Sequence, residues 1–253
     1  MTSLCSALDP SAYATGRIAR ENKTLFRPGG LELTVRAIAL AGMRRGSKVV
    51  DIGCGAGQSV AYLRTRGFEA MGIDCAVSDK QAVHPPDSHQ HIVANADELP
   101  LRDCSTDGVL AECSLSVMQD QERVLAECAR VLVDGGRLMI SDLYARQPKA
   151  IARVRALKRS CAAGMIIREE LEARLDKQGF TVDVWEDHSQ ALRECAARFI
   201  LEHGSLDGLW QCDGNDSVET IQAAMKAVRA GYFLLVARRR QREARPGGRN
   251  DER

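Results

Sequence analysis

The sequence predicts an α/β fold: a doubly wound, mostly parallel sheet of seven strands with helices on both faces. Short apolar runs alternate along the chain with longer segments of helical periodicity. That order is typical of βαβ units, in which helices connect parallel strands. The 253 residues contain no evident linker and fit one domain of ordinary size.

The stretch Ser47–Gln58, SKVVDIGCGAGQ, has the most informative pattern in the chain. Its apolar first half predicts a short buried strand, and Gly53, Gly55 and Gly57 predict a turn that leads into a helix. Glycine suits this turn because it accepts a positive φ and lets a ligand approach the backbone, while the helix start offers N–H groups. We therefore expect a ligand site here.

The spacing of the glycines indicates which ligand binds. The dinucleotide fingerprint G-x-G-x-x-G requires a glycine where this chain has Gln58. Asp51, before the first glycine, would repel a pyrophosphate but can accept a hydrogen bond from a cationic amino group. The pattern D-x-G-x-G-x-G resembles the first motif of the class I S-adenosylmethionine (SAM)-dependent methyltransferases. A glycine-rich turn without a cofactor is the alternative.

The second predicted strand, residues 68–74, ends in a carboxylate. Asp74 lies 17 residues past Gly57, close to where a βαβ unit places an acidic residue that holds ribose hydroxyls. A carboxylate can accept two hydroxyl hydrogen bonds and repels phosphorylated riboses. We prefer this interpretation to a residue that only caps a turn.

A third strand over residues 91–95 leads into a segment that resembles another methyltransferase motif. In that family the acidic side chain and the next backbone N–H bind the adenine edge. In this chain Asn95 stands at the acidic position and Ala96 at the backbone donor, and the Asn95 carbonyl oxygen can still accept from the adenine amino group. Asp97 is the substitute if the alignment differs by two residues.

The next segments extend the resemblance. We expect a strand over 106–113, a helix over 119–132 that Gly135 and Gly136 close as C-cap residues, and a strand over 137–144. The phrase VLAECARVLVDGGRLMISD closely resembles the helix–GG–strand segment of the same methyltransferases. The resemblance covers about residues 47–144 and implies a Rossmann-like class I methyltransferase fold with SAM as cofactor.

The remaining elements are less standard. We expect a first helix from residue 31, later helices over 150–161, 167–178, 189–203 and 217–230, and strands over 181–185 and 232–238. The resemblance implies that the last strand is antiparallel and lies between the fifth and sixth. The expected organisation is an N-terminal lid and first helix (1–46), a SAM-binding domain (47–238) with a helical insertion (189–230), and a disordered basic tail (239–253). The insertion can serve as a cap or a partner surface, so a homodimer stays open.

Composition excludes several partners. A net charge of +1 does not indicate the basic surface that binds nucleic acid. No apolar run has the length of a membrane span, so we expect the protein in the cytoplasm. Nine cysteines without a C-x-x-C pair favour reduced thiols. His84, His89 and His91 lack the spacing of metal ligands, and we predict no metal site.

In a doubly wound sheet, ligands bind beyond the carboxyl ends of the strands. The methyl group of SAM would then point toward Glu112, Cys113 and Ser114, which end the fourth strand, and we expect Glu112 to contact the cofactor. Because the sulfonium is a good leaving group, the protein chiefly supplies proximity, orientation and water exclusion.

Three functions compete. Cys113 and Cys161 resemble cysteines of the arsenite methyltransferases and could hold a trivalent metalloid, although either could be a packing residue. The broader hypothesis is methyl transfer to a small organic acceptor, as in the quinone-biosynthesis methyltransferases that residues 47–144 also resemble. For that reaction His188, beside two acidic residues, has the ingredients of a general base. The alternative is a turn and a helix cap formed by Asp187 or Ser189. The third is a non-catalytic SAM-binding sensor or scaffold.

Overall fold

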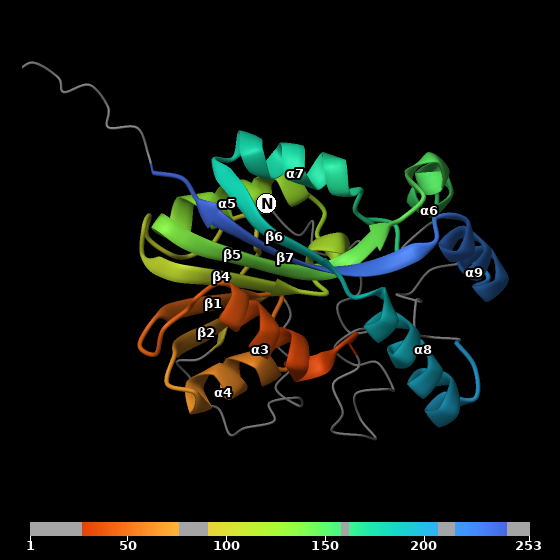
Figure 1. Ribbon diagram of the computed structural model, residues 1–253, viewed down its shortest axis with the longest axis horizontal. Coiled ribbons are helices and arrows are strands. Elements are labelled where there is room, and N and C mark those ends of the chain that lie inside the picture. The colour runs from red at the N-terminus through yellow and green to blue at the C-terminus, as the bar shows by residue number, and fades with distance from the viewer. Residues whose placement is uncertain (1–26, 76–90, 158–161, 207–215, 242–253) are drawn as a thin grey trace, which may run out of the picture.

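The computed structural model describes residues 27–75, 91–157, 162–206 and 216–241. A seven-stranded sheet forms its centre, in the order β3-β2-β1-β4-β5-β7-β6 (Figure 1). The strands are β1 Lys48–Ile52, β2 Glu69–Asp74, β3 His91–Val93, β4 Thr106–Glu112, β5 Leu132–Ala145, β6 Phe180–Asp187 and β7 Ala230–Arg239. The predicted fold class is confirmed.

The strand directions determine which ends meet. β1 to β5 pair in parallel with their neighbours in the sheet, whereas β7 is antiparallel to both β5 and β6. The position and direction expected for the last strand are therefore confirmed. As a result, the carboxyl ends of β1, β4, β5 and β6 and the start of β7 share one edge of the sheet, which we call the carboxyl edge.

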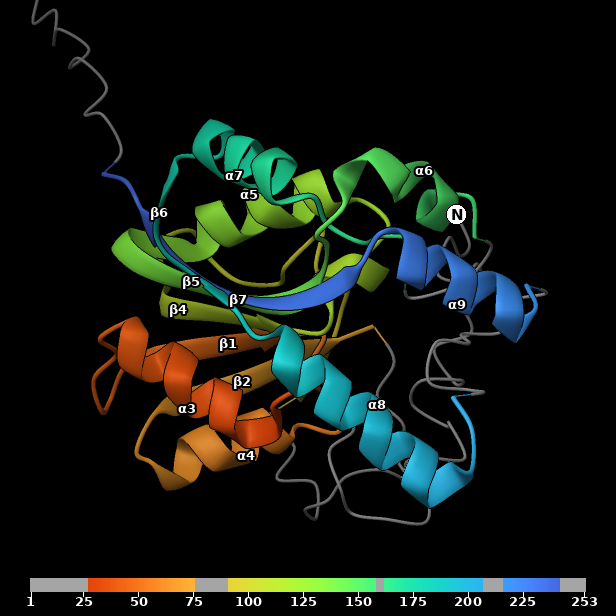
Figure 2. The same ribbon diagram turned by 45° about the vertical axis from the view of Figure 1, so that its right-hand side comes forward.

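Helices cover both faces of the sheet (Figures 1 and 2). They are α3 Gly30–Leu40, α4 Gln58–Thr65, α5 Gln121–Val131, α6 Ile151–Arg155, α7 Arg168–Lys177, α8 Ser189–His203 and α9 Val218–Ala227. α3 and α4 lie on one face and α5 and α7 on the other in both views. We call these the α3 face and the α5 face.

The strands are apolar on both sides because each face packs on helices. In β1, Val49 belongs to the buried cluster on the α3 face and Val50 to the cluster on the α5 face. α5 contributes the predicted stripe that includes Val124, Leu125 and Cys128. Burial of each large apolar side chain is worth about 1.5–3 kcal/mol, so this packing holds the layers together.

Two expectations about local structure were wrong. Gly135 and Gly136 do not cap α5, because the helix ends at Val131 and Leu132 is already extended. Leu132 is fully buried and pairs with Thr106, which draws the chain directly into β5 and places both glycines inside that strand. The helix expected over 150–161 is also shorter, since α6 ends at Arg155.

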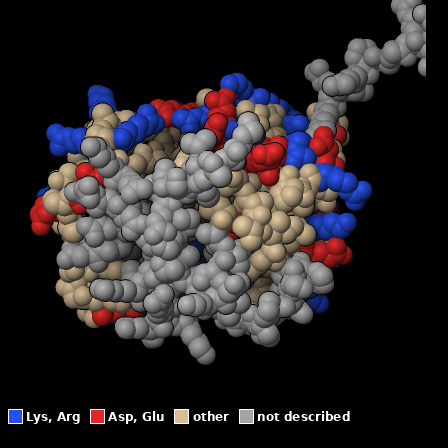
Figure 3. All heavy atoms as spheres, turned by 180° about the vertical axis from the view of Figure 1, so that it is seen from behind, with Lys and Arg blue, Asp and Glu red and all other residues tan. Residues whose placement is uncertain are grey.

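Some expectations fall outside the described residues. They concern most of the lid (1–26), His84, His89, Cys161 and the tail beyond residue 241. Of the helices that the structure describes, none has the length and hydropathy of a membrane span. On the face in Figure 3, the described Lys and Arg side chains are interspersed with Asp and Glu.

A buried carboxylate fixes the loop after β4. Asp142 of β5 is inaccessible to solvent and accepts hydrogen bonds from the backbone N–H of Ser116 (2.8 Å), the Ser116 hydroxyl (2.7 Å) and its neighbour Leu143 (2.7 Å). Burial raises the pKa of Asp142, although these donors lower it. The bonds hold the short 3₁₀ turn Leu115–Val117 against β5.

Gly164 packs against the same turn and yields a stability prediction. A Cβ at this position would lie 1.9 Å from the Ser116 carbonyl oxygen, so Gly164→Ala forces the backbone apart and should lower the free energy of unfolding by about 1–3 kcal/mol. The control is Ala163→Gly, which should cost at most about 1 kcal/mol. Urea unfolding measures both, and equal effects would contradict the proposed clash.

Candidate active site

The glycine turn follows β1 and is tied to the end of β2. Gly53, Gly55 and Gly57 have φ values of 71°, 51° and 73°, which favour glycine. The Gly53 N–H donates to the Ile73 carbonyl oxygen at 2.7 Å, and the Gly55 N–H donates to Asp74 Oδ2 at 2.8 Å. The turn and Asp74 therefore form one unit.

The three glycines differ in the space around them. A Cβ on Gly53 would lie 2.5 Å from the Ser114 Cβ, and one on Gly57 would lie 2.1 Å from His91 Nε2. A Cβ on Gly55 would meet no atom within 4 Å. Packing therefore requires a glycine at Gly53, and a side chain at Gly57 would have to displace the His91 imidazole, whereas Gly55 borders open space into which a ligand can fit.

The residues expected at the adenine lie beside this turn. β3 pairs with β2, so that Val93 stands opposite Asp74 and the chain turns away immediately afterwards. Asn95 is exposed and Ala96 is half-buried. The backbone carbonyl oxygen of Asn95 accepts from the Glu98 N–H at 3.2 Å. The ends of β1, β2 and β3 thus bring all these candidate residues to one edge.

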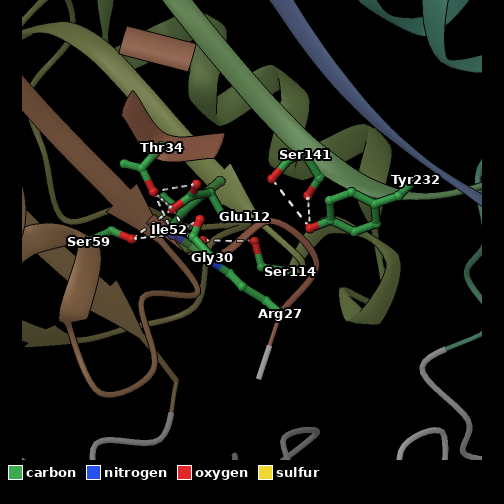
Figure 4. A network of polar contacts seen from close by, with 9 residues as sticks. All are labelled: Arg27, Gly30, Thr34, Ile52, Ser59, Glu112, Ser114, Ser141 and Tyr232. Atoms are coloured by element: carbon green, nitrogen blue, oxygen red, sulfur yellow. Dashed lines mark hydrogen bonds and ion pairs between the residues drawn. The ribbon is translucent and has the colours of Figure 1, made fainter. Parts of the chain in front are cut away.

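Glu112, at the end of β4, is the centre of a buried polar network (Figure 4). Its carboxylate forms an ion pair with Arg27 and accepts hydrogen bonds from the Thr34 hydroxyl (3.0 Å) and the Ser59 hydroxyl (2.7 Å). Arg27 Nη2 also donates to Thr34 Oγ1 at 2.5 Å, to Ser59 Oγ at 3.0 Å and to the Gly30 carbonyl oxygen at 3.3 Å. We call Arg27, Thr34, Ser59 and Glu112 the Arg27 network.

The carboxyl groups around this network are close enough to affect one another. Burial raises the pKa of Asp51 well above its usual value, and the neighbouring Glu112 carboxylate raises it further, whereas Arg27 lowers it. Burial disfavours a charged guanidinium, but Glu112 keeps the pKa of Arg27 above its usual value. An added positive charge beside Asp51 would favour its ionised form.

Cys113 follows Glu112 in a backbone conformation that is uncommon for residues other than glycine, with φ of 55°. Its N–H donates to the Ser141 carbonyl oxygen at 2.7 Å, and its side chain is half-buried. The same carbonyl accepts from the buried Tyr232 hydroxyl at 3.2 Å, and burial raises the pKa of that hydroxyl. Cys161 lies outside the described residues, so its expected pairing with Cys113 stays a hypothesis.

His188 lies at the carboxyl end of β6, directly before α8. Its Nε2 is 2.9 Å from Glu186 Oε2. Arg36 of α3 donates to the same carboxylate at 2.6 and 3.2 Å, and this hydrogen bonding lowers the pKa of Glu186. His188 is the N-cap residue of α8 and makes no side-chain cap hydrogen bond, whereas Asp187 Oδ1 accepts from the Ser189 N–H at 2.7 Å.

A cavity of about 350 Å³ lies apart from this network. It is formed between the starts of α5 and α7, with Gln121, Ile167 and Arg174 among its lining residues. This position is on the α5 face, whereas the Arg27 network lies on the α3 face. We therefore assign the cavity no part in the site.

Sequence reasoning missed Arg27, Thr34, Ser59 and Tyr232. Each belongs to the α3 face of the carboxyl edge but stands alone in the sequence. The sequence feature that could have indicated Arg27 is the loop Arg27–Gly30, in which an arginine precedes Pro-Gly-Gly at the start of a predicted helix. A buried position for that arginine required a partner that only the fold supplies.

The glycine turn yields a second prediction. Gly53→Ala and Gly55→Ala both place a Cβ at positive φ, which costs about 1–2 kcal/mol. Gly53→Ala also produces the contact with Ser114, so it should lower the free energy of unfolding by about 1–3 kcal/mol more. Urea unfolding of the pair tests this, and equal losses would refute the difference in space.

Comparisons with known proteins show which family the chain resembles. The family described as "Methyltransferase domain" matches residues 50–140. "O-methyltransferase resE" of Aspergillus sclerotiorum is 30% identical over 91% of this chain and 86% of that protein. "27-O-demethylrifamycin SV methyltransferase" of Amycolatopsis mediterranei is 30% identical, with 82% of each covered.

A solved structure supports the fold. Phosphoethanolamine N-methyltransferase 2 of Haemonchus contortus, in complex with SAM, superposes with a TM-score of 0.69 at 17% identity, over 95% of this chain and 61% of that one. The two chains share a fold, and this chain is 30% identical to the two methyltransferases above. The chain belongs to the class I SAM-dependent methyltransferases.

Proposed function

We propose that this small-molecule methyltransferase transfers the methyl group of SAM to an oxygen atom of an organic acceptor. The observation that carries the proposal is the 30% identity, over most of both chains, to two proteins whose names describe O-methylation. The carboxyl edge supports it, because it places His188 on the same edge as the glycine turn.

We place the cofactor along the ends of β1, β2 and β3. The open space at Gly55 and the carboxylate of Asp74 fit a ribose, and Asn95 with Ala96 fits the adenine edge. The methionine part then lies toward Asp51, and a cationic amino group there would favour the ionised form of this buried carboxyl group. Gly53 and Gly57 preserve the shape of the turn.

SAM, when bound, supplies an electrophilic methyl group on a sulfonium. The chain must hold the acceptor in line with that methyl group and exclude water. An acceptor hydroxyl also loses a proton during the transfer, and a basic side chain within reach accelerates this step. His188 is the candidate, because Glu186 orients its imidazole and Arg36 in turn fixes Glu186.

The metalloid hypothesis makes a different demand. It requires a second thiolate beside Cys113, because two soft ligands would have to hold the trivalent ion. Transfer to oxygen requires no thiolate, and in that case the half-buried Cys113 packs at the end of β4. We therefore prefer the organic acceptor.

The cofactor placement predicts the effect of Asp74→Asn. The amide oxygen can still accept from the Gly55 N–H, so the fold should be retained. Loss of the negative charge should weaken SAM binding about tenfold, since charge-assisted hydrogen bonds to the ribose become neutral ones. Isothermal titration calorimetry measures the affinity.

The matched control is Asp183→Asn on β6, where the carboxylate pairs with Arg137 at the surface. It should leave SAM affinity unchanged. Wild-type affinity in Asp74→Asn would remove Asp74 from the cofactor site.

The reaction proposal predicts the effect of His188→Ala. With an acceptor hydroxyl as substrate, kcat should fall by about 10²–10⁴, the usual contribution of general base catalysis. SAM affinity should stay at the wild-type value, because His188 lies away from the glycine turn. His203→Ala, at the end of α8, is the control and should retain kcat.

Steady-state kinetics of both variants tests whether His188 acts as the general base. Unchanged kcat in His188→Ala would eliminate this residue as the base. Unchanged product formation in Cys113→Ser would oppose the metalloid hypothesis.

A further inference from the structure

Arg27 has one hydrogen-bond donor that the described residues do not use. Its Nη1 and Nη2 atoms are bound by Glu112, Thr34, Ser59 and Gly30. Its Nε atom is buried and has no hydrogen-bond partner. The side chain is only 10% exposed to solvent, and a buried donor without an acceptor is costly. This cost points to an acceptor that arrives with a ligand.

The position of Arg27 indicates which part of a ligand that would be. Ser59 lies in the first turn of α4, directly after the glycine turn, and Glu112 ends β4. Ser114, two residues further, donates to the Ile52 carbonyl oxygen at 2.9 Å, which joins the tips of β4 and β1. Arg27 therefore lies where the glycine turn meets the tip of β4, on the side away from Asp74 and the adenine segment.

Charge indicates the chemistry of that part. Glu112 and Asp74 raise the pKa of Asp51, and the positively charged Arg27 lowers it. The methionine moiety of SAM carries an ammonium group and a carboxylate. The carboxyl groups attract the ammonium but repel the carboxylate, so the carboxylate needs the guanidinium.

We propose that Arg27 binds the α-carboxylate of the SAM methionine moiety through its Nε–H. Glu112 is the positioning residue: with Thr34 and Ser59 it holds the guanidinium before the cofactor arrives, so little conformational freedom is lost on binding. This inference rests on the cofactor placement proposed above and not on the identity of the acceptor.

The test separates recognition of the carboxylate from a structural role. S-Adenosylhomocysteine carries the amino-acid moiety, whereas 5′-methylthioadenosine has the same nucleoside without it. Arg27→Gln alone would leave Glu112 buried without its cation, so the informative variant is Arg27→Gln/Glu112→Gln, in which two amides can pair. Glu112→Gln, which keeps the guanidinium, is the matched control.

Calorimetric titration of the full chain gives the affinity ratio of the two ligands. In the double variant the preference for S-adenosylhomocysteine should fall about 10- to 100-fold, while 5′-methylthioadenosine binds within about twofold of wild type. Glu112→Gln keeps the guanidinium but removes the carboxylate that positions it, so this variant should lose less of the preference than the double variant. Equal weakening of both ligands, no change in the ratio, or an equal loss of preference in Glu112→Gln would overturn the proposal.

A measurement on the wild-type chain covers a double variant that fails to fold. S-Adenosylhomocysteine without its α-carboxylate should bind at least about tenfold more weakly than the intact compound. Equal affinity would overturn the proposal. Neither measurement contains a methyl acceptor, so failure of the O-methylation proposal would leave these results unaffected.

Discussion

The buried ion pair between Arg27 and Glu112 is the interaction on which the candidate site depends. It joins the residues before α3 to the tip of β4, and through Ser59 it reaches the first turn of α4. Removal of one partner from a buried pair costs about 3–5 kcal/mol, because the other charge remains without compensation. The glycine turn, α3 and the end of β4 are therefore positioned together.

The direction of β7 completes this edge of the sheet. Because β7 runs antiparallel to β5, its first residues lie beside the last residues of β5, and the Tyr232 hydroxyl reaches the Ser141 carbonyl oxygen. Glu112 and Ser141 stand opposite each other in the pairing of β4 and β5. A row of buried polar groups thus crosses three strands on the α3 face, where an all-parallel sheet would have placed the start of β7 at the opposite edge.

The site separates into two parts that differ in their construction. The cofactor part, as proposed, rests on short turns at the ends of β1, β2 and β3 and on the Arg27 network. The acceptor part, as proposed, lies toward β6 and α8, where Arg36, Glu186 and His188 form a partly exposed chain of contacts.

The sequence by itself determined the fold class and the family, because both depend on local patterns: apolar runs, a glycine turn and segments of known spacing. The position of the last strand followed only from the resemblance to that family. The grouping of Gly55 with Asp74 also followed, since one helical crossover separates them. Only the tertiary structure identified the Arg27 network, because Arg27 and Glu112 are 85 residues apart and Thr34 and Glu112 are 78 apart. No periodicity connects residues at such separations. Tertiary contacts also decided where α5 ends. Leu132 is buried and pairs with Thr106 in the sheet, so the helix ends before Gly135 and Gly136, which the sequence suggested as its C-cap.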